Sequence, residues 1–172
     1  ALRGHFISGV VVATLALGIK PVAIVLLPFL ALIAAGSGAS WIRRARYGAI
    51  AGFIALSTLF ITSALAETGP FGWIGSLSTP GTVKSWLSPT TAIGMLIGGP
   101  IRMLGFGNVV DTSVGITRLI GSVILAIVLV LLVVRPAGRS ATRGVALSFV
   151  ALVVLGPVVQ PWYLLWSIPL LA

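Results

Sequence analysis

Long apolar runs separated by short polar segments dominate the pattern along this chain. The runs cover residues 6–19, 21–35, 47–66, 118–134 and 145–159, and a further helix starts within 162–172. They are continuous, whereas the strands of membrane barrels alternate apolar and polar positions over segments of about ten residues. A bilayer-spanning helix needs about 20 apolar residues, which 47–66 supplies. The pattern predicts one all-α, polytopic transmembrane bundle over 1–172, with about five to six membrane helices.

The sequence Lys20-Pro21 interrupts the first apolar region and admits two interpretations. One is a single kinked span over residues 6–35, and the other is a hairpin of two short helices. A Lys in mid-membrane costs about 2.5–3.5 kcal/mol on insertion scales, and Pro21 has no backbone N–H to donate. Both problems disappear if Lys20 lies at a membrane face. We therefore prefer the hairpin of 6–19 and 21–35.

Residues 67–117 form the only long stretch without a membrane-helix pattern, and they hold both acidic residues, Glu67 and Asp111. Ser88 suits a helix N-cap, and Pro89 suits the first helical position. The sequence Gly98-Gly99-Pro100 is expected to break or kink this short interfacial helix. We expect the helix to lie flat on the outer leaflet through an apolar face of Ala92, Met95, Leu96, Ile101 and Leu104.

The composition agrees with a membrane protein. Hydrophobic residues make up 58% of the chain and charged residues only 8%, against about 25% charged residues in soluble domains. There is no Cys, so disulfides and thiolate metal sites are excluded. The net charge of +9 lies in short loops between apolar runs. This placement favours a topology signal over a nucleic-acid surface, and no nucleic-acid partner is expected.

The positive charges predict an orientation. Seven of the 11 basic residues are expected on the cytoplasmic side, namely Arg3, Arg43, Arg44, Arg46, Arg135, Arg139 and Arg143. The other four, Lys20, Lys84, Arg102 and Arg118, then fall on the outer side. Under the positive-inside rule the protein is a multi-pass plasma-membrane protein whose 67–117 loop is extracytoplasmic. Because the chain starts without Met and stops inside an apolar run, we expect it to be part of a longer protein.

Catalytic groups are scarce. Acid–base chemistry on carboxylates usually needs a pair, but Glu67 and Asp111 are 44 positions apart. A helix-end role for Glu67 and a cap or turn role for Asp111 explain both residues. His5 is the single histidine, at a membrane edge. We therefore assign no catalytic residue, no metal ligand and no cofactor.

Two groups of residues are candidates for substrate binding. Lys20, Arg102 and Arg118 lie near the predicted interface, where they suit contact with a lipid phosphate, although snorkelling at span ends explains Lys20 and Arg118 as well. Gln160, Trp162 and Tyr163 cluster at a Pro-broken helix end. Aromatic rings stack on the apolar faces of sugars and an amide binds hydroxyls, whereas the alternative role for the rings is an interfacial aromatic belt.

The stretch Gly-Pro-Val-Val-Gln-Pro-Trp-Tyr-Leu-Leu-Trp at 156–166 resembles the polyprenol-phosphate-mannose-dependent α-(1→6)-mannosyltransferases of actinobacteria. Those enzymes are GT-C-type integral membrane glycosyltransferases. Further similar stretches are Gly18 to Pro21 with Leu26-Leu27-Pro28, Gly72-Trp73, and Thr79-Pro80-Gly81 to Trp86–Thr90. The similarity runs over nearly the whole chain and is most specific at 156–166.

The resemblance implies a GT-C-like fold. It also implies transfer of mannose from a polyprenol-phosphate-mannose donor to a mannan or glycolipid acceptor on the outer face, with no nucleotide-sugar site. Position by position, Lys20 would approach the donor phosphate, and Gln160, Trp162 and Tyr163 would line the cavity. The catalytic base of such enzymes lies in a first external loop that has no counterpart here. Two alternatives remain open: a transporter or flippase of lipid-linked saccharides, and a non-catalytic membrane scaffold.

Overall fold

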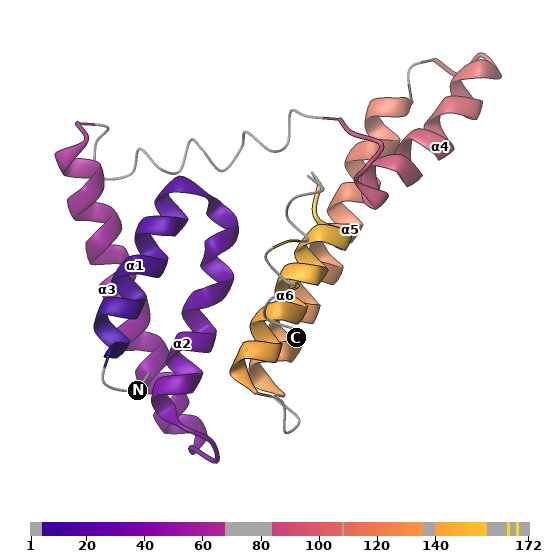
Figure 1. Ribbon diagram of the computed structural model, residues 1–172. Coiled ribbons are helices and arrows are strands. Elements are labelled where there is room, and N and C mark those ends of the chain that lie inside the picture. Colours follow the sequence, from indigo (N-terminus) through magenta and orange to yellow (C-terminus); the bar gives the residue numbers. More distant parts are fainter. Residues whose placement is uncertain are drawn as a thin grey trace. The chain divides into compact units, whose positions relative to one another are not determined.

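The computed structural model describes residues 5–67, 84–107, 109–135 and 140–157, together with Leu165 and Ile168. Every regular element in these ranges is helical (Figure 1). The chain divides into two compact units. Unit 1 comprises residues 1–78 with 136–145, and unit 2 comprises residues 79–135 with 146–172.

Unit 1 begins with a helical hairpin. Helix α1 spans Phe6–Ile19, the 3-10 helix η2 spans Pro21–Val25, and α2 continues over Leu26–Ala35. Between them Lys20 is extended, with φ −138°, and its N–H still bonds to the Ala16 carbonyl at 2.8 Å. Pro21 occupies the first position of η2, where no N–H is needed. The two arms form an arch in Figure 1 rather than a single kinked span.

Helix α3 spans Trp41–Leu65 and begins six residues before the expected start at Tyr47. The Ser40 hydroxyl caps it by accepting a hydrogen bond from the Arg43 N–H at 3.4 Å. The three arginines expected in the preceding loop, Arg43, Arg44 and Arg46, therefore lie inside the helix. The loop expectation failed because a serine N-cap starts a helix even when basic residues fill its first turns.

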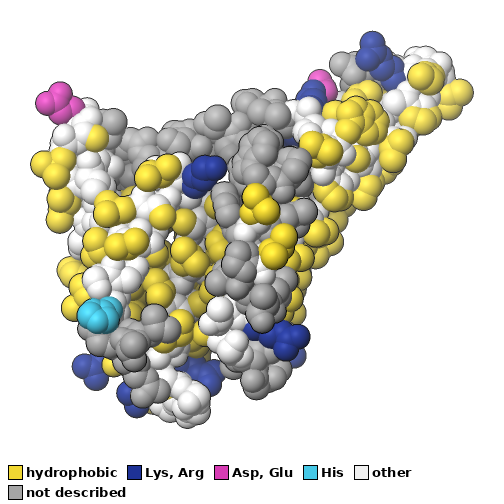
Figure 2. Space-filling model, viewed as in Figure 1, with side chains coloured by type: hydrophobic (Ala, Val, Ile, Leu, Met, Phe, Trp, Pro, Cys, Tyr) yellow, Lys and Arg dark blue, Asp and Glu magenta, His cyan; other side chains and the backbone are white. Residues whose placement is uncertain are grey.

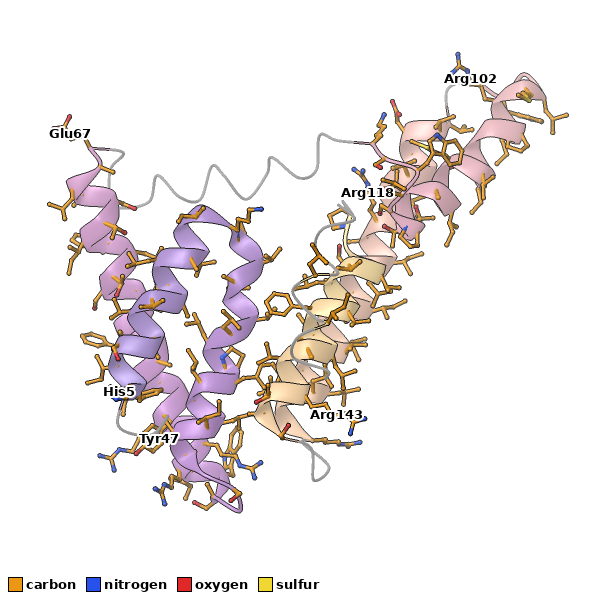
Figure 3. The ribbon with its side chains drawn as sticks, in the orientation of Figure 1. His5, Tyr47, Glu67, Arg102, Arg118 and Arg143 are labelled. Atoms are coloured by element: carbon orange, nitrogen blue, oxygen red, sulfur yellow. The ribbon has the colours of Figure 1, made fainter. Side chains whose placement is uncertain are left out.

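Small residues bring α1, α2 and α3 together. Val10, Ala31 and Ala51, one from each helix, form the buried centre of unit 1. At one end the Phe6 and Tyr47 rings meet edge to face, with centroids 5.4 Å apart. Figure 3 shows His5 and Glu67 at opposite ends of this unit. The basic start of α3 thus lies at the His5 end, and the end of α3 lies at the Glu67 end.

Unit 2 is built on a second hairpin, in which α4 (Pro89–Met103) packs along α5 (Val110–Val134). The two glycines of Gly94-Met-Leu-Ile-Gly98 face α5. A Cβ atom on Gly94 would stand 2.5 Å from the Val114 Cα, and one on Gly98 would stand 2.6 Å from the Val110 Cα. Small residues four positions apart allow two helices to approach this closely, as in the small-xxx-small pattern. Helix α4 continues through Gly98-Gly99-Pro100, so the expected break is wrong, whereas a kink there stays a prediction. Gly98 serves close packing against Val110.

Most apolar side chains of the two longest helices point outward. Figure 2 shows many apolar side chains on the surface of the molecule. On α5 only Val114, Gly121 and Leu132 are buried, whereas large residues such as Leu119 and Val130 are exposed. An uninterrupted apolar surface of this kind is unfavourable in water. Helices α3 and α5 are the two, among the described residues, that are long and apolar enough to cross a membrane. These features indicate a membrane protein, and α1, η2–α2 and α6 are shorter apolar helices.

Helix α6 spans Ala141–Leu155, so it begins four residues before the expected 145. Near its start Gly144 lies against the ring of buried Phe29 in α2, and a Cβ atom there would collide with the ring. An apolar groove of about 250 Å³ lies next to this contact in unit 1, between α1 and α2. Its lining includes Gly9, Ala13, Ala16 and Leu30, which offer surface to hydrocarbon rather than to sugar hydroxyls.

Candidate functional site at the junction of α4, α5 and α6

Hydroxyl groups at the start of α4 bind the chain where it leaves α6, inside unit 2. The Ser88 hydroxyl donates to the Gly156 carbonyl at 2.9 Å, and the Thr90 hydroxyl donates to the same oxygen at 3.2 Å. Ser88 is fully buried and Thr90 nearly so. Carbonyls past a helix end have no partner within the helix and are costly to bury alone. The α4 hydroxyls therefore stabilise the end of α6.

Thr91 extends this junction to a charged group on α5. Its hydroxyl donates to the Pro157 carbonyl at 3.1 Å and accepts the Nε–H of Arg118 at 2.9 Å. Thr91 is fully buried, and Arg118 is half-buried. A hydrogen bond from a charged donor is roughly twice as strong as a neutral one. Arg118 is thus tied, through one hydroxyl, to the backbone two residues beyond the end of α6.

Gly121 is the point where the three helices meet. A Cβ atom at Gly121 would collide with the Thr90 side chain and stand 2.9 Å from the Leu155 carbonyl oxygen. Only glycine leaves room for this approach. The junction is therefore closely packed as well as hydrogen-bonded, and the positions of Thr90 and Thr91 are fixed by both.

The depth of Arg118 along α5 suits a membrane interface. Arg118 and Arg135 are 17 positions apart in sequence, which corresponds to about 26 Å along a helix. The hydrocarbon core of a bilayer is about 30 Å thick. Both guanidinium groups can therefore reach headgroup level, at opposite faces.

The other basic candidates lie apart from this junction. Arg102 is exposed in the last turn of α4, 11 positions beyond Thr91, or about 16 Å along the helix. Figure 3 shows Arg102 and Arg118 well separated within unit 2. Lys20 is exposed at the α1–η2 turn and belongs to unit 1. Of these three basic candidates, Arg118 is the one that is hydrogen-bonded within the α4–α5–α6 junction.

The remaining candidates, Gln160, Trp162 and Tyr163, lie outside the described residues. The last described position before them is Pro157, whose carbonyl binds Thr91. In sequence, the junction therefore immediately precedes the Gln160–Tyr163 segment.

The two acidic residues have separate structural settings. Asp111 lies in the first turn of α5 and forms an ion pair with Lys84. An acidic residue there is favoured by the positive end of the helix dipole. Glu67 is exposed just beyond the end of α3, with a left-handed φ of 55°. Both settings fit the helix-end and turn roles expected from the sequence.

Sequence reasoning missed two features of this site. Ser88 does lie at the N-cap position of α4, but its side chain makes no cap hydrogen bond and binds Gly156 instead. The hydroxyls of Thr90 and Thr91, which follow directly, also bind carbonyls beyond α6. The available signal was the run of four residues Ser88-Pro89-Thr90-Thr91, because consecutive hydroxyls in an apolar chain need buried acceptors.

Comparison with known proteins gives a consistent family. Residues 90–172 match the MptB C-terminal domain. An α-(1→6)-mannopyranosyltransferase of Mycobacterium tuberculosis is 38% identical over 100 residues, which cover 57% of this chain and 17% of that protein. The α-(1→6)-mannopyranosyltransferase B of Corynebacterium glutamicum is 35% identical over 128 residues, covering 72% of this chain and 21% of that protein.

The match of greatest extent among these is to the α-(1→6)-mannopyranosyltransferase A of M. tuberculosis, 32% identical over 99% of this chain and 34% of that protein. No solved structure matches. The chain spans about a third or less of the length of the curated relatives it matches. It belongs to the α-(1→6)-mannopyranosyltransferase family and represents part of the length of its members.

Proposed function

We propose that the full-length protein transfers mannose from a polyprenol-phosphate-mannose donor to a mannan or glycolipid acceptor at the outer face of the plasma membrane. The observation that carries this proposal is the Arg118 guanidinium, whose Nε–H is bound by Thr91 at the α4–α5–α6 junction. The junction lies within the part of the chain that matches the family. The relatives are named as α-(1→6)-mannopyranosyltransferases, which supports the sugar and the linkage.

The reaction exchanges two bonds at the anomeric carbon of mannose. The acceptor oxygen forms a new bond to this carbon, the bond to the donor phosphate breaks, and the acceptor proton passes to a base. Polyprenyl phosphate leaves with added negative charge. A fixed guanidinium near that phosphate stabilises the charge as it develops, and it does so more strongly where water is excluded. We assign this role to Arg118. Lys20, which belongs to unit 1, is proposed separately as a contact to a lipid phosphate.

The other candidates take supporting roles in the proposal. Gln160, Trp162 and Tyr163 line the sugar cavity, with rings stacking on the sugar and the amide binding hydroxyls. Arg102, exposed at the end of α4 and about 16 Å along the helix from Thr91, is a separate candidate for contact with a phosphate. The base lies elsewhere in the full-length protein, because Asp111 is already paired with Lys84 and Glu67 projects from a helix end.

The proposal is tested with membranes that contain or lack the full-length protein. Each preparation receives mannose-labelled polyprenol-phosphate-mannose, or a labelled nucleotide-sugar donor, with a lipid-anchored mannan acceptor. We expect protein-dependent label in the acceptor from the lipid donor alone. Label from the nucleotide sugar only would contradict the proposal. Movement of a lipid-linked saccharide across the membrane without transfer would favour a flippase.

A further inference from the structure

Thr91 and Ser88 both bind the chain just beyond α6, but only Thr91 also contacts Arg118. Both are fully buried at the start of α4, and both donate a hydroxyl proton to a carbonyl just beyond α6. The oxygen of Thr91 also accepts the Arg118 Nε–H at 2.9 Å. The oxygen of Ser88 lies 3.1 Å from the neighbouring Thr90 hydroxyl. Ser88 therefore has a structural role alone, whereas Thr91 has the same role and also binds the Arg118 guanidinium.

The direction of the hydrogen bonds at Thr91 is forced. A threonine hydroxyl has one proton and two lone pairs, and a guanidinium only donates. Because the proton goes to the Pro157 carbonyl, a lone pair faces Arg118. A guanidinium is a planar fork, so a bond at Nε restricts the orientation of the whole plane.

Thr91 is itself rigidly placed. One helical turn further along α4, Gly94 is in close contact with Val114 and Thr117 of α5. Arg118 follows Thr117 directly in α5. The acceptor and the donor are therefore carried by two helices that cannot shift without breaking their packing. Side chains locked in this way hold binding groups to a narrow geometry.

We propose that Thr91 is a positioning residue, which fixes the Arg118 guanidinium in the orientation that binds the phosphate of a polyprenyl phosphate. The inference rests on the proposed function and adds a residue to it. Thr91 does not touch the substrate. It acts through Arg118, whereas Ser88 stabilises the same helix end without this contact.

The test uses the full-length protein in detergent and two readouts. The first is affinity for polyprenyl phosphate without sugar, measured as the lipid-dependent rise of the unfolding temperature. The second is KM and kcat for mannosyl transfer. Thr91→Val removes the hydroxyl at nearly constant shape, Thr91→Ser keeps it, and Ser88→Ala is the matched control.

We expect Thr91→Val to weaken polyprenyl phosphate binding about tenfold, as for loss of one hydrogen bond to a charged group. In the same variant, KM for the donor rises by a larger factor than kcat falls. Thr91→Ser restores the affinity. Ser88→Ala lowers the unfolding temperature in the absence of lipid but leaves the affinity unchanged.

The decisive comparison is a double-mutant cycle. If Thr91 acts through Arg118, Thr91→Val causes no further loss of affinity in an Arg118→Gln background. An equal loss in both backgrounds, or the same loss with Ser88→Ala, shows a merely structural role and overturns the inference. If Thr91→Val fails to fold, Arg118→Lys replaces it. That change keeps the charge without the planar fork, so a similar loss supports positioning and unchanged affinity overturns it.

The two proposals fail in different ways. A wild-type protein that binds polyprenyl phosphate with the expected coupling but transfers no mannose overturns the proposed function and supports the positioning role. If the protein transfers mannose, but the losses of affinity caused by Thr91→Val and Arg118→Gln simply add, the proposed function stands and the positioning role is overturned. A protein that does not bind polyprenyl phosphate overturns both.

Discussion

Gly94 of α4 lies so close to Val114 of α5 that a Cβ atom on Gly94 would stand 2.5 Å from the Val114 Cα. The contact brings the backbones of α4 and α5 close together. Helices in lipid gain little from hydrophobic burial against each other, so close packing of small residues carries much of their association. The α4–α5 hairpin, and with it the junction at Arg118, therefore depends on this glycine.

Gly94→Ala is expected to destabilise the protein by about 1–3 kcal/mol, the range for overpacking a filled site. The added methyl group meets backbone atoms of Val114, which cannot rotate away. Thermal unfolding of the purified full-length protein in detergent measures the change.

Gly115→Ala is the matched control in α5. No atom lies within 4 Å of a Cβ at Gly115, and the residue is exposed. Replacing an unconstrained helical glycine by alanine stabilises a helix by about 0.5–1 kcal/mol. Opposite signs for the two substitutions are expected, and equal effects would show that α4 and α5 do not pack closely.

Asp111→Asn is expected to leave mannosyl transfer close to the wild-type rate. The carboxylate pairs with Lys84, and the two side chains are 60% and 45% exposed, respectively. An exposed pair contributes about 0.2–1 kcal/mol to the free energy of unfolding. The small loss in stability should fade in high salt, where the charges are screened. A fall in kcat by several orders of magnitude would instead make Asp111 the catalytic base.

Lys20→Ala is expected to abolish transfer from polyprenol-phosphate-mannose while the protein inserts normally. The hydrogen bonds at the α1–η2 turn use the Lys20 backbone, namely its N–H to Ala16 and its carbonyl from Ala23. These two bonds do not involve the ammonium group, so its removal leaves them in place. Lys20→Arg should retain activity, and Ile19→Ala, at the exposed preceding position, should be silent. Full turnover by Lys20→Ala would exclude contact with the phosphate.

Introduced cysteines test the orientation, since the chain itself contains no Cys. Phe106 is exposed in the α4–α5 turn, and Ser37 is exposed in the α2–α3 turn. An impermeant maleimide should label Phe106→Cys in intact cells and Ser37→Cys only after lysis. The reverse pattern would invert the topology.

The break at Lys20-Pro21 was predictable because it follows from strong local effects. A charge in hydrocarbon and a missing N–H both oppose a continuous helix, and the structure has its turn at Lys20. The start of α5 was harder to predict from the sequence. Residues 110–117 include Asp111, Thr112 and Ser113, and they were taken as loop because they are polar. They form the first two turns of α5, where an acidic residue and hydroxyls are favourable.

Tertiary contacts explain the remaining differences. Gly98 was read as a helix breaker from its neighbours Gly99 and Pro100, but it serves contact with Val110. Ser88 was placed correctly at the helix start, yet its hydroxyl binds a carbonyl 68 positions away. Neither partner is visible in local sequence. Arg118 was identified from its charge near an interface, whereas its link to Thr91 required the fold.

Transfer by Arg118→Gln compared with Arg135→Gln tests the central claim most directly. The two arginines lie near opposite ends of the apolar part of α5, so the comparison removes the same charge at either end of that segment. The measurement is KM and kcat for labelled polyprenol-phosphate-mannose with the full-length protein in membranes. We predict a raised KM and a lowered kcat for Arg118→Gln, and near wild-type kinetics for Arg135→Gln. Wild-type kinetics for Arg118→Gln, or equal losses for both variants, would contradict a phosphate-binding site at the junction.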